Sequence, residues 1–157
     1  GTLRTDDPRL LLRDRSRGRD PVKVVLSGSG ALDPAARFFT VGEAPRLVYT
    51  SQPDVAAARV GHVATVVDAG DPLDLHRVLA DLHGRGVARL MVEGGAQVHA
   101  LVLAADVVDE VHLVVAPVVV GDPDAPRFGG TRPRLLGLRV LESRPMGDLV
   151  LLRYGRG

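Results

Sequence analysis

Apolar runs of strand length alternate with segments of helical character along most of the chain. Short β-branched runs bounded by turn residues predict three strands, at residues 22–26, 46–50 and 62–67. Asp33-Pro34 has the pattern of a helix N-cap followed by proline at the first helical position, and residues 53–59 suit another short helix. Strands that alternate with helices favour a parallel sheet with right-handed crossovers.

A longer amphipathic helix is predicted to open at Asp71-Pro72 and to end at the glycines of residues 84–86. Its apolar stripe, spaced i, i+3, i+4 and i+7, is formed by Leu75, Val78, Leu79 and Leu82. The apolar run at residues 87–92 then has strand length, and residues 96–105 form helix readily because they contain neither Gly nor Pro.

The pattern changes after Asp109. Residues 109–120 predict a long strand, broken or bulged at Pro117, and residues 121–130 form a loop rich in Pro, Gly and Asp. Two further strands, at residues 135–143 and 148–154, predict a terminal hairpin. We therefore expect an α/β fold with a mixed, mostly parallel sheet, flanking helices and a C-terminal antiparallel hairpin, with residues 1–157 as one domain.

Composition narrows the possible functions. The chain has 157 residues, enough for a sizeable core. A net charge of +1 and an aromatic content of 3% give no support for a nucleic acid or membrane partner. The absence of cysteine excludes disulfides and thiolate metal sites and fits a cytoplasmic protein. The five histidines show no metal-ligand spacing, so no metal site is expected.

Glu93-Gly94-Gly95-Ala96 lies where an apolar strand is expected to turn into a helix. Two glycines let the backbone approach a ligand, and the helix N-terminus behind them suits a phosphate or pyrophosphate. A carboxylate before the glycines suits a polar substrate group. The same residues are also compatible with an ordinary tight turn, and the GxGxxG fingerprint is absent.

Three segments resemble a known family when they are taken together. They are the opening GTLRTDDPRLLLR, the stretch VEGGAQVHALVLAADVVDEVHLVVAPVVVG and the terminal hairpin. Their order and spacing resemble the pyrimidine reductases of riboflavin biosynthesis, which have a dihydrofolate reductase-like fold. In two-domain bacterial members a zinc deaminase domain precedes this reductase domain, and a chain without cysteine does not contain that zinc site.

The resemblance implies an NADPH-dependent oxidoreductase. Its substrate would be a 5-amino-6-(5-phosphoribosylamino)uracil-type phosphorylated pyrimidine, whose ribosyl group is reduced to ribityl. The family begins with a core strand, carrying a Ser-Leu-Asp-Gly-like segment, and a helix that are missing before Gly1, so the domain is expected to be N-terminally incomplete. The family also implies a homodimer.

The same resemblance assigns roles to residues near the start of the chain. Thr2 would lie near the nicotinamide or its ribose phosphate, and Asp6 would contact the substrate near the reacting ribose. Arg9 and Arg13 are candidates for the substrate phosphate, since a guanidinium donates two hydrogen bonds to a phosphate. Two of these residues have a plainer alternative. Thr2 could be a helix N-cap or part of a frayed terminus, and Asp6-Asp7-Pro8 also makes a good turn.

The remaining candidates concern the cofactor and the pyrimidine. Ser27, Gly28 and Ser29 form a small polar loop that could bind the 2′-phosphate of NADP, with Thr50 bordering the adenosine; a plain surface loop is equally compatible. Gly94, Gly95 and Ala96 would hold the pyrophosphate. Glu93 would accept hydrogen bonds from the amino and N–H groups of the pyrimidine. Asp6 and Glu93 are therefore the candidate catalytic residues.

Two other functions stay open. One is a dihydrofolate reductase-like enzyme that reduces another pyrimidine or a pteridine, for which Arg13 would lose its purpose if the substrate carried no phosphate. The other is a non-catalytic paralogue that binds NADP without oxidising NADPH.

Overall fold

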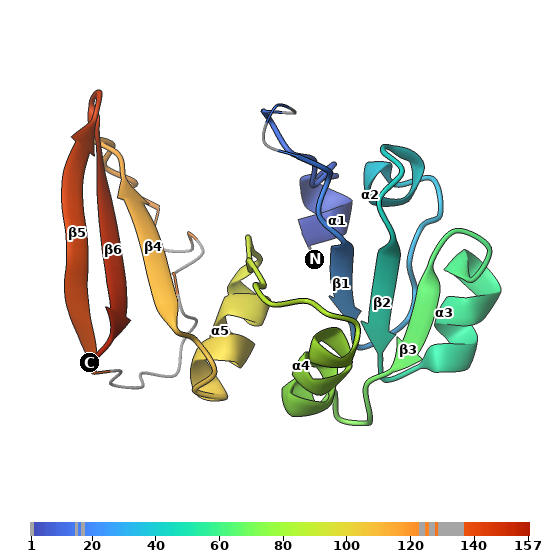
Figure 1. The fold of residues 1–157 in the computed structure, drawn as a ribbon. Helices are drawn as coiled ribbons and strands as arrows, with labels where there is room; N and C mark the ends of the chain where they lie inside the picture. The colour runs from blue at the N-terminus through green and yellow to red at the C-terminus, as the bar shows by residue number, and fades with distance from the viewer. Residues whose placement is uncertain (1, 15, 17, 123–124, 126–127, 129–136) are drawn as a thin grey trace. The chain divides into compact units, whose positions relative to one another are not determined.

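The computed structural model describes residues 2–14, 16, 18–122, 125, 128 and 137–157. It divides into two compact units, residues 1–95 and residues 96–157 (Figure 1). The strands form two sheets, one in each unit. The parallel strand–helix units and the terminal antiparallel hairpin predicted from the sequence are both present, but the described strands distribute them over two sheets and not one.

The first unit contains a parallel sheet in the order β1-β2-β3 (Figure 1). Its elements are α1 (Thr2–Thr5), β1 (Lys23–Ser27), α2 (Arg37–Thr40), β2 (Arg46–Thr50), α3 (Pro53–Val60), β3 (Thr65–Asp68) and α4 (Leu75–Gly84). The middle strand β2 is the most buried, with four of its five residues buried, because it has neighbours on both sides. The three predicted strands are confirmed: the bounds of β2 match, those of β1 differ by one residue at each end, and those of β3 by three and one.

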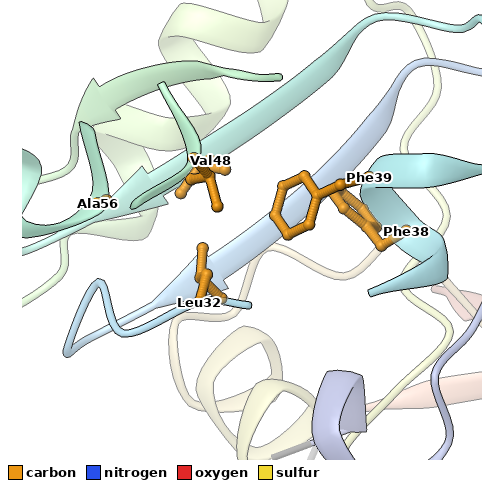
Figure 2. Packing of buried hydrophobic residues seen from close by; sticks show 6 residues of the cluster. Leu32, Phe38, Phe39, Val48 and Ala56 are labelled. Carbon is orange, nitrogen blue, oxygen red and sulfur yellow. The ribbon is translucent and has the colours of Figure 1, made fainter. Parts of the chain in front are cut away.

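The core of this unit is apolar and lies beside β2. Figure 2 shows Phe38 and Phe39 of α2 together with Val48 of β2 and Leu32 from the loop after β1. The two phenylalanine rings meet edge to face, with 4.8 Å between centroids. Ala56 and Val60 of α3 complete the buried set. Partly buried side chains from the start of the chain, Leu3 and Leu10, pack against the same cluster.

Two helix starts differ from the prediction. The helix expected from Asp71-Pro72 begins at Leu75, because Asp74 is the N-cap: its Oδ1 accepts hydrogen bonds from the backbone N–H groups of His76 and Arg77, at 2.8 and 3.4 Å. The helical turn expected at Asp33-Pro34 is a non-helical turn, since Asp33 Oδ1 accepts from Ala35 N at 2.9 Å and closes a local ring. Helix α2 starts after that turn, at Arg37.

The strand predicted at residues 87–92 is absent. This segment has no regular secondary structure and pairs with none of the described strands. Its apolar side chains are partly in solvent, with Met91 72% exposed. An apolar run needs a neighbouring backbone to become a strand, because a strand cannot satisfy its own N–H and C=O groups. Helix α5 (Ala96–Ala104), which follows, confirms the predicted helix.

The second unit consists of α5 and an antiparallel sheet in the order β4-β6-β5 (Figure 1). Its strands are β4 (Glu110–Val115), β5 (Leu138–Met146) and β6 (Leu149–Arg156). The predicted hairpin is confirmed, with Gly147 at a φ of +64° in the turn. The long strand predicted at 109–120 stops at Val115, which pairs with Val150. Its partner β6 extends only one residue further in this direction, to Leu149, so β6 could not pair with the whole of the apolar run 116–120. Much of the loop predicted at 121–130 lies outside the described residues.

The register of this sheet separates two kinds of side chain. Charged residues from three strands share one face: Glu110 and His112 of β4, Glu142 and Arg144 of β5, and Arg153 of β6. The opposite face carries mainly apolar residues, among them Val111, Leu113, Val150 and Leu152. The alternation is that of a sheet with one face turned to an apolar environment.

Candidate functional site

Three polar residues meet at the carboxyl edge of the parallel sheet. Ser27 ends β1, Thr50 ends β2 and Asp68 ends β3; the register pairs Ser27 with Thr50 and Thr50 with Asp68. Ligands of open α/β sheets bind outside the carboxyl ends of the strands, so this edge is the first place to look for a cofactor. Ser27 and Thr50 were singled out from the sequence. Asp68 was not, because only the pairing of β3 with β2 brings it to this edge.

The loop after β1 is held by its own hydroxyls. Ser27 Oγ accepts a hydrogen bond from Gly30 N at 3.1 Å, and Ser29 Oγ accepts from Ala31 N at 3.3 Å. Gly28 and Ser29 are exposed, and a Cβ placed on Gly28 would have nothing within 4 Å. A hydroxyl that already accepts a bond keeps its proton to donate, so Ser27 and Ser29 can each donate to a phosphate oxygen.

Gly30 fixes this loop against the start of α3. Its φ is +64°, and a Cβ there would lie 2.8 Å from the carbonyl oxygen of Gln52 and 3.0 Å from the backbone nitrogen of Ala56. Both atoms belong to the backbone and cannot rotate away. Only glycine therefore allows the loop to approach α3 this closely.

Thr50 is turned into the protein. It is 0% exposed, and its Oγ1 accepts a hydrogen bond from Gln52 N at 3.0 Å, just before α3. In this structure Thr50 therefore secures the link between β2 and α3. Its predicted contact with the adenosine would need an exposed hydroxyl and stays a prediction.

The segment after α1 carries the substrate-binding candidates. Asp6, Arg9 and Arg13 are all exposed, within a stretch without regular secondary structure. The segment is tied to the rest of the unit by Asp7, whose Oδ1 accepts a hydrogen bond from Arg37 N at 2.7 Å. Thr2 is the first residue of α1, and its side chain lies outside what the structure describes.

The Glu93-Gly94-Gly95 segment ends the first unit, and Ala96 begins α5 in the second. Glu93 is exposed. Gly95 has a φ of +75°, which favours glycine, and a Cβ on Gly94 would meet nothing within 4 Å. The predicted turn into a helix is therefore confirmed at its helical end, whereas the strand expected before it is not formed.

Three hydrogen-bonded polar side chains link β2 to α4 in the first unit, and only the first of them is buried. Tyr49 is fully buried and donates from its hydroxyl to Asp81 Oδ2 at 2.6 Å, and Arg85 Nε donates to the same oxygen at 2.6 Å. Burial, followed by the hydrogen bond to Asp81, raises the pKa of Tyr49 well above its usual value. The hydrogen bond from Arg85 is the main reason why the pKa of Asp81 is lowered. The bond from Tyr49 to Asp81 therefore ties α4 to β2 at the residue next to Thr50.

The only lysine of the sequence, Lys23, is buried at the opposite end of the sheet. Its Nζ donates to the carbonyl oxygens of Phe38 and Val41, at 3.3 and 2.5 Å, and so satisfies groups at the end of α2. Burial, and then the positive charge of Arg46, lower the pKa of Lys23. A shallow hollow of about 480 Å³ opens near this edge, lined by Gly18, Arg19, Asp20, Glu43, Ala44 and Pro45. It contains none of the residues singled out from the sequence.

Within the described residues there is no cluster of His, Asp or Glu that could hold a metal ion. In the same part of the chain, no helix has the length and apolar character that a membrane span requires.

A protein-family model that matches nearly the whole chain identifies the family. The family model of the RibD C-terminal domain matches residues 1–152. The chain belongs to the RibD C-terminal domain family. This confirms the resemblance to riboflavin-biosynthesis reductases that was drawn from the three sequence segments.

Several relatives of this RibD C-terminal domain are named for the same activity. A 2,5-diamino-6-ribosylamino-4(3H)-pyrimidinone 5′-phosphate reductase of Methanothermobacter thermautotrophicus is 39% identical over 79% of the chain and 59% of its own length. Reductases of the same name from Aquifex aeolicus and Archaeoglobus fulgidus are each 33% identical, over 82% and 99% of the chain and 59% and 77% of their own lengths. The chain thus spans about three fifths of the first two relatives.

Solved structures show the fold. A deaminase/reductase of Thermotoga maritima superposes with a TM-score of 0.83 at 23% identity, over 100% of this chain and 43% of that protein. A pyrimidine reductase-like protein of Corynebacterium diphtheriae gives 0.80 at 23% identity, over 98% and 72%. The dihydrofolate reductase-like fold class predicted from the sequence is confirmed.

Proposed function

We propose that this RibD C-terminal domain is an NADPH-dependent reductase of a phosphorylated ribosylaminopyrimidine. The observation that carries the proposal is the set of relatives, 33–39% identical over most of the chain, that are named as reductases of such a phosphate. The reaction is the reduction of a ribosyl to a ribityl group. When bound, the nicotinamide supplies the hydride, and the residues of this chain bind and orient the two reactants.

The carboxyl edge of the parallel sheet supports the cofactor part of the proposal. Ser27, Gly28 and Ser29 combine hydroxyl donors with an exposed glycine, which suits the 2′-phosphate of NADP. Thr50 holds the neighbouring start of α3 in place. We assign the pyrophosphate to Gly94, Gly95 and Ala96, where two glycines precede the first N–H groups of α5, which have no acceptor within the helix.

Exposed charges support the substrate part. Asp6 would contact the substrate near the reacting ribose, and Arg9 and Arg13 would bind its phosphate through their guanidinium groups. The Glu93 carboxylate would accept hydrogen bonds from the donor groups of the pyrimidine. We further propose that residues 1–157 act as one reductase domain, in the cytoplasm and as a homodimer.

The test is NADPH oxidation, followed at 340 nm, by the full chain. It is offered the 2,5-diamino substrate for which the relatives are named and, separately, the deaminated uracil analogue. Turnover with either supports the proposal and identifies the substrate. NADPH binding without turnover on either would refute it, and would favour another pyrimidine or pteridine substrate or a non-catalytic NADP-binding protein.

Replacement of one carboxylate tests the site itself. Glu93→Gln keeps the size of the side chain but replaces an acceptor oxygen by a donor, so we expect KM for the pyrimidine to rise or kcat to fall by about tenfold or more. The dissociation constant of NADPH should change by less than about twofold. Glu43→Gln, an exposed carboxylate near the opposite edge of the sheet, is the matched control. Equal losses of pyrimidine and NADPH affinity would remove Glu93 from the substrate site.

A further inference from the structure

Asp7 joins two segments that lie far apart in the sequence. Its Oδ1 accepts a hydrogen bond from the backbone nitrogen of Arg37 at 2.7 Å, across 30 residues. Arg37 is the first residue of α2, so its N–H has no acceptor within the helix. The residue before it, Ala36, has no side chain that could cap the helix. The carboxylate of Asp7 therefore supplies the missing acceptor from another part of the chain.

The backbone of Asp7 is also unusual. Its φ is +40°, in the left-handed region, and the next residue is Pro8. Asp and Asn enter this region more readily than other residues with a Cβ, but they still do so at a cost in energy. The hydrogen bond to Arg37 lies at the position where the chain makes this turn. It can offset that cost and hold the turn in one conformation.

Asp6 lies between two residues, Leu3 and Leu10, that are packed against the core. Leu3 before it and Leu10 after it pack against the core cluster that contains Phe38 and Phe39 of α2. Further along, Leu12 N donates to Asp20 Oδ1 at 2.9 Å. Between Leu3 and Leu10, Asp6 itself is exposed. The bond from Asp7 to α2 is the polar anchor next to Asp6 in the sequence.

We propose that Asp7 is a positioning residue: it holds Asp6 and Arg9 in the orientation that binds the substrate, through its bond to Arg37 N, without touching the substrate itself. The inference rests on the proposed function, because it takes Asp6 and Arg9 as substrate-binding residues. According to this proposal α2, which contributes to the core, also sets the geometry of the segment 6–13 that carries the substrate-binding candidates.

Variants on both sides of the bond test this. Asp7→Gly keeps the left-handed φ but removes the acceptor, whereas Asp7→Asn keeps both a carbonyl acceptor and tolerance of that φ. Arg37→Pro removes the donor and leaves Asp7 intact. Proline is accepted at the first position of a helix, and Ala36 already has the φ of −58° and ψ of 144° that suit a residue before proline. Arg37→Ala is its control, because it removes the side chain and keeps the N–H.

Two readouts are needed. The first is amide hydrogen exchange of the full chain at Arg37, whose N–H donates to Asp7, and at Leu12, whose N–H donates to Asp20 further along the same segment. It reports order without any activity. We expect exchange at Leu12 to rise about tenfold or more in Asp7→Gly and Arg37→Pro, and exchange at Arg37 to rise likewise in Asp7→Gly. Both should stay within about twofold of the wild type in Asp7→Asn and Arg37→Ala. The second is steady-state kinetics with the pyrimidine phosphate. We expect kcat/KM to fall about tenfold in the first pair and to stay within about twofold in the second, with the dissociation constant of NADPH unchanged throughout.

Unchanged exchange at Leu12 in Asp7→Gly and Arg37→Pro would overturn the proposal, whatever the enzyme does. So would increased exchange together with unchanged kcat/KM. A wild-type chain that turns over neither substrate would refute the proposed function, and that result is separate from the exchange measurement. If Asp7→Gly fails to fold, Arg37→Pro and Arg37→Ala alone decide the question.

Discussion

Gly30 offers the sharpest test of how the loop after β1 is built. Replacing it with alanine would place a Cβ 2.8 Å from Gln52 O and 3.0 Å from Ala56 N. The left-handed φ of +64° costs a residue with a Cβ about 1–2 kcal/mol. Crowding against a packed backbone adds typically about 1–3 kcal/mol. We therefore expect Gly30→Ala to lower the free energy of unfolding by about 2–5 kcal/mol.

Urea denaturation followed by circular dichroism measures this free energy, and Gly28→Ala is the control two residues away. A Cβ on Gly28 meets nothing within 4 Å, and its φ is not left-handed. Its free energy of unfolding should therefore stay within about 0.5 kcal/mol of the wild type. Equal effects of the two variants would refute the reasoning, since they would show that the approach of the loop to α3 does not limit which residue fits.

Two further predictions concern the polar contacts of each unit. Tyr49→Phe removes the hydroxyl that donates to Asp81 and should lower the free energy of unfolding by about 1–3 kcal/mol, measured in urea; a change below about 0.5 kcal/mol would show that the bond adds nothing. In the second unit, the hydrogen bond from His112 and then that from Arg153 lower the pKa of Glu110 from 4.5 to about 2. A carboxylate with a depressed pKa stabilises the folded state above its unfolded pKa and loses that contribution as the pH falls through its folded value. The stability difference between the wild type and Glu110→Gln should therefore be full at pH 6 and shrink between about pH 4.5 and 2, whereas a constant difference would contradict this assignment.

Local pattern predicted the elements whose residues satisfy one another within a short stretch. The strand at residues 46–50 and the helix at residues 96–105 were expected within one residue of their observed bounds. In a helix the backbone groups bond within the segment, so composition alone is informative. The run 46–50 is apolar and bounded by turn residues, and it became the central strand because neighbours exist on both sides.

The predictions that failed did so for different structural reasons. Residues 87–92 have the apolar pattern of a strand but pair with none of the strands that the structure describes. The pairing of strand β4 with β6 stops at Val115, opposite Val150 near the start of β6, and not where the apolar run ends. Helix α4 begins at Leu75 because the Asp74 side chain caps it, although Asp71-Pro72 also fits the pattern of a helix start. Each outcome depends on a contact that the hydrophobic pattern does not encode.

The candidate site divides in the same way. The sequence alone determined the residue types, since glycines, hydroxyls, arginines and carboxylates suit a phosphorylated substrate and a nicotinamide cofactor, and three ordered segments identified the family. Only the tertiary structure decided which of them are neighbours. Strand register brought Ser27, Thr50 and Asp68 to one edge, and the packing of the chain start against α2 brought Asp7 to Arg37. A side chain's chemistry is local, but its partners are set by contacts between segments distant in the sequence, and those contacts exist only once the chain has folded.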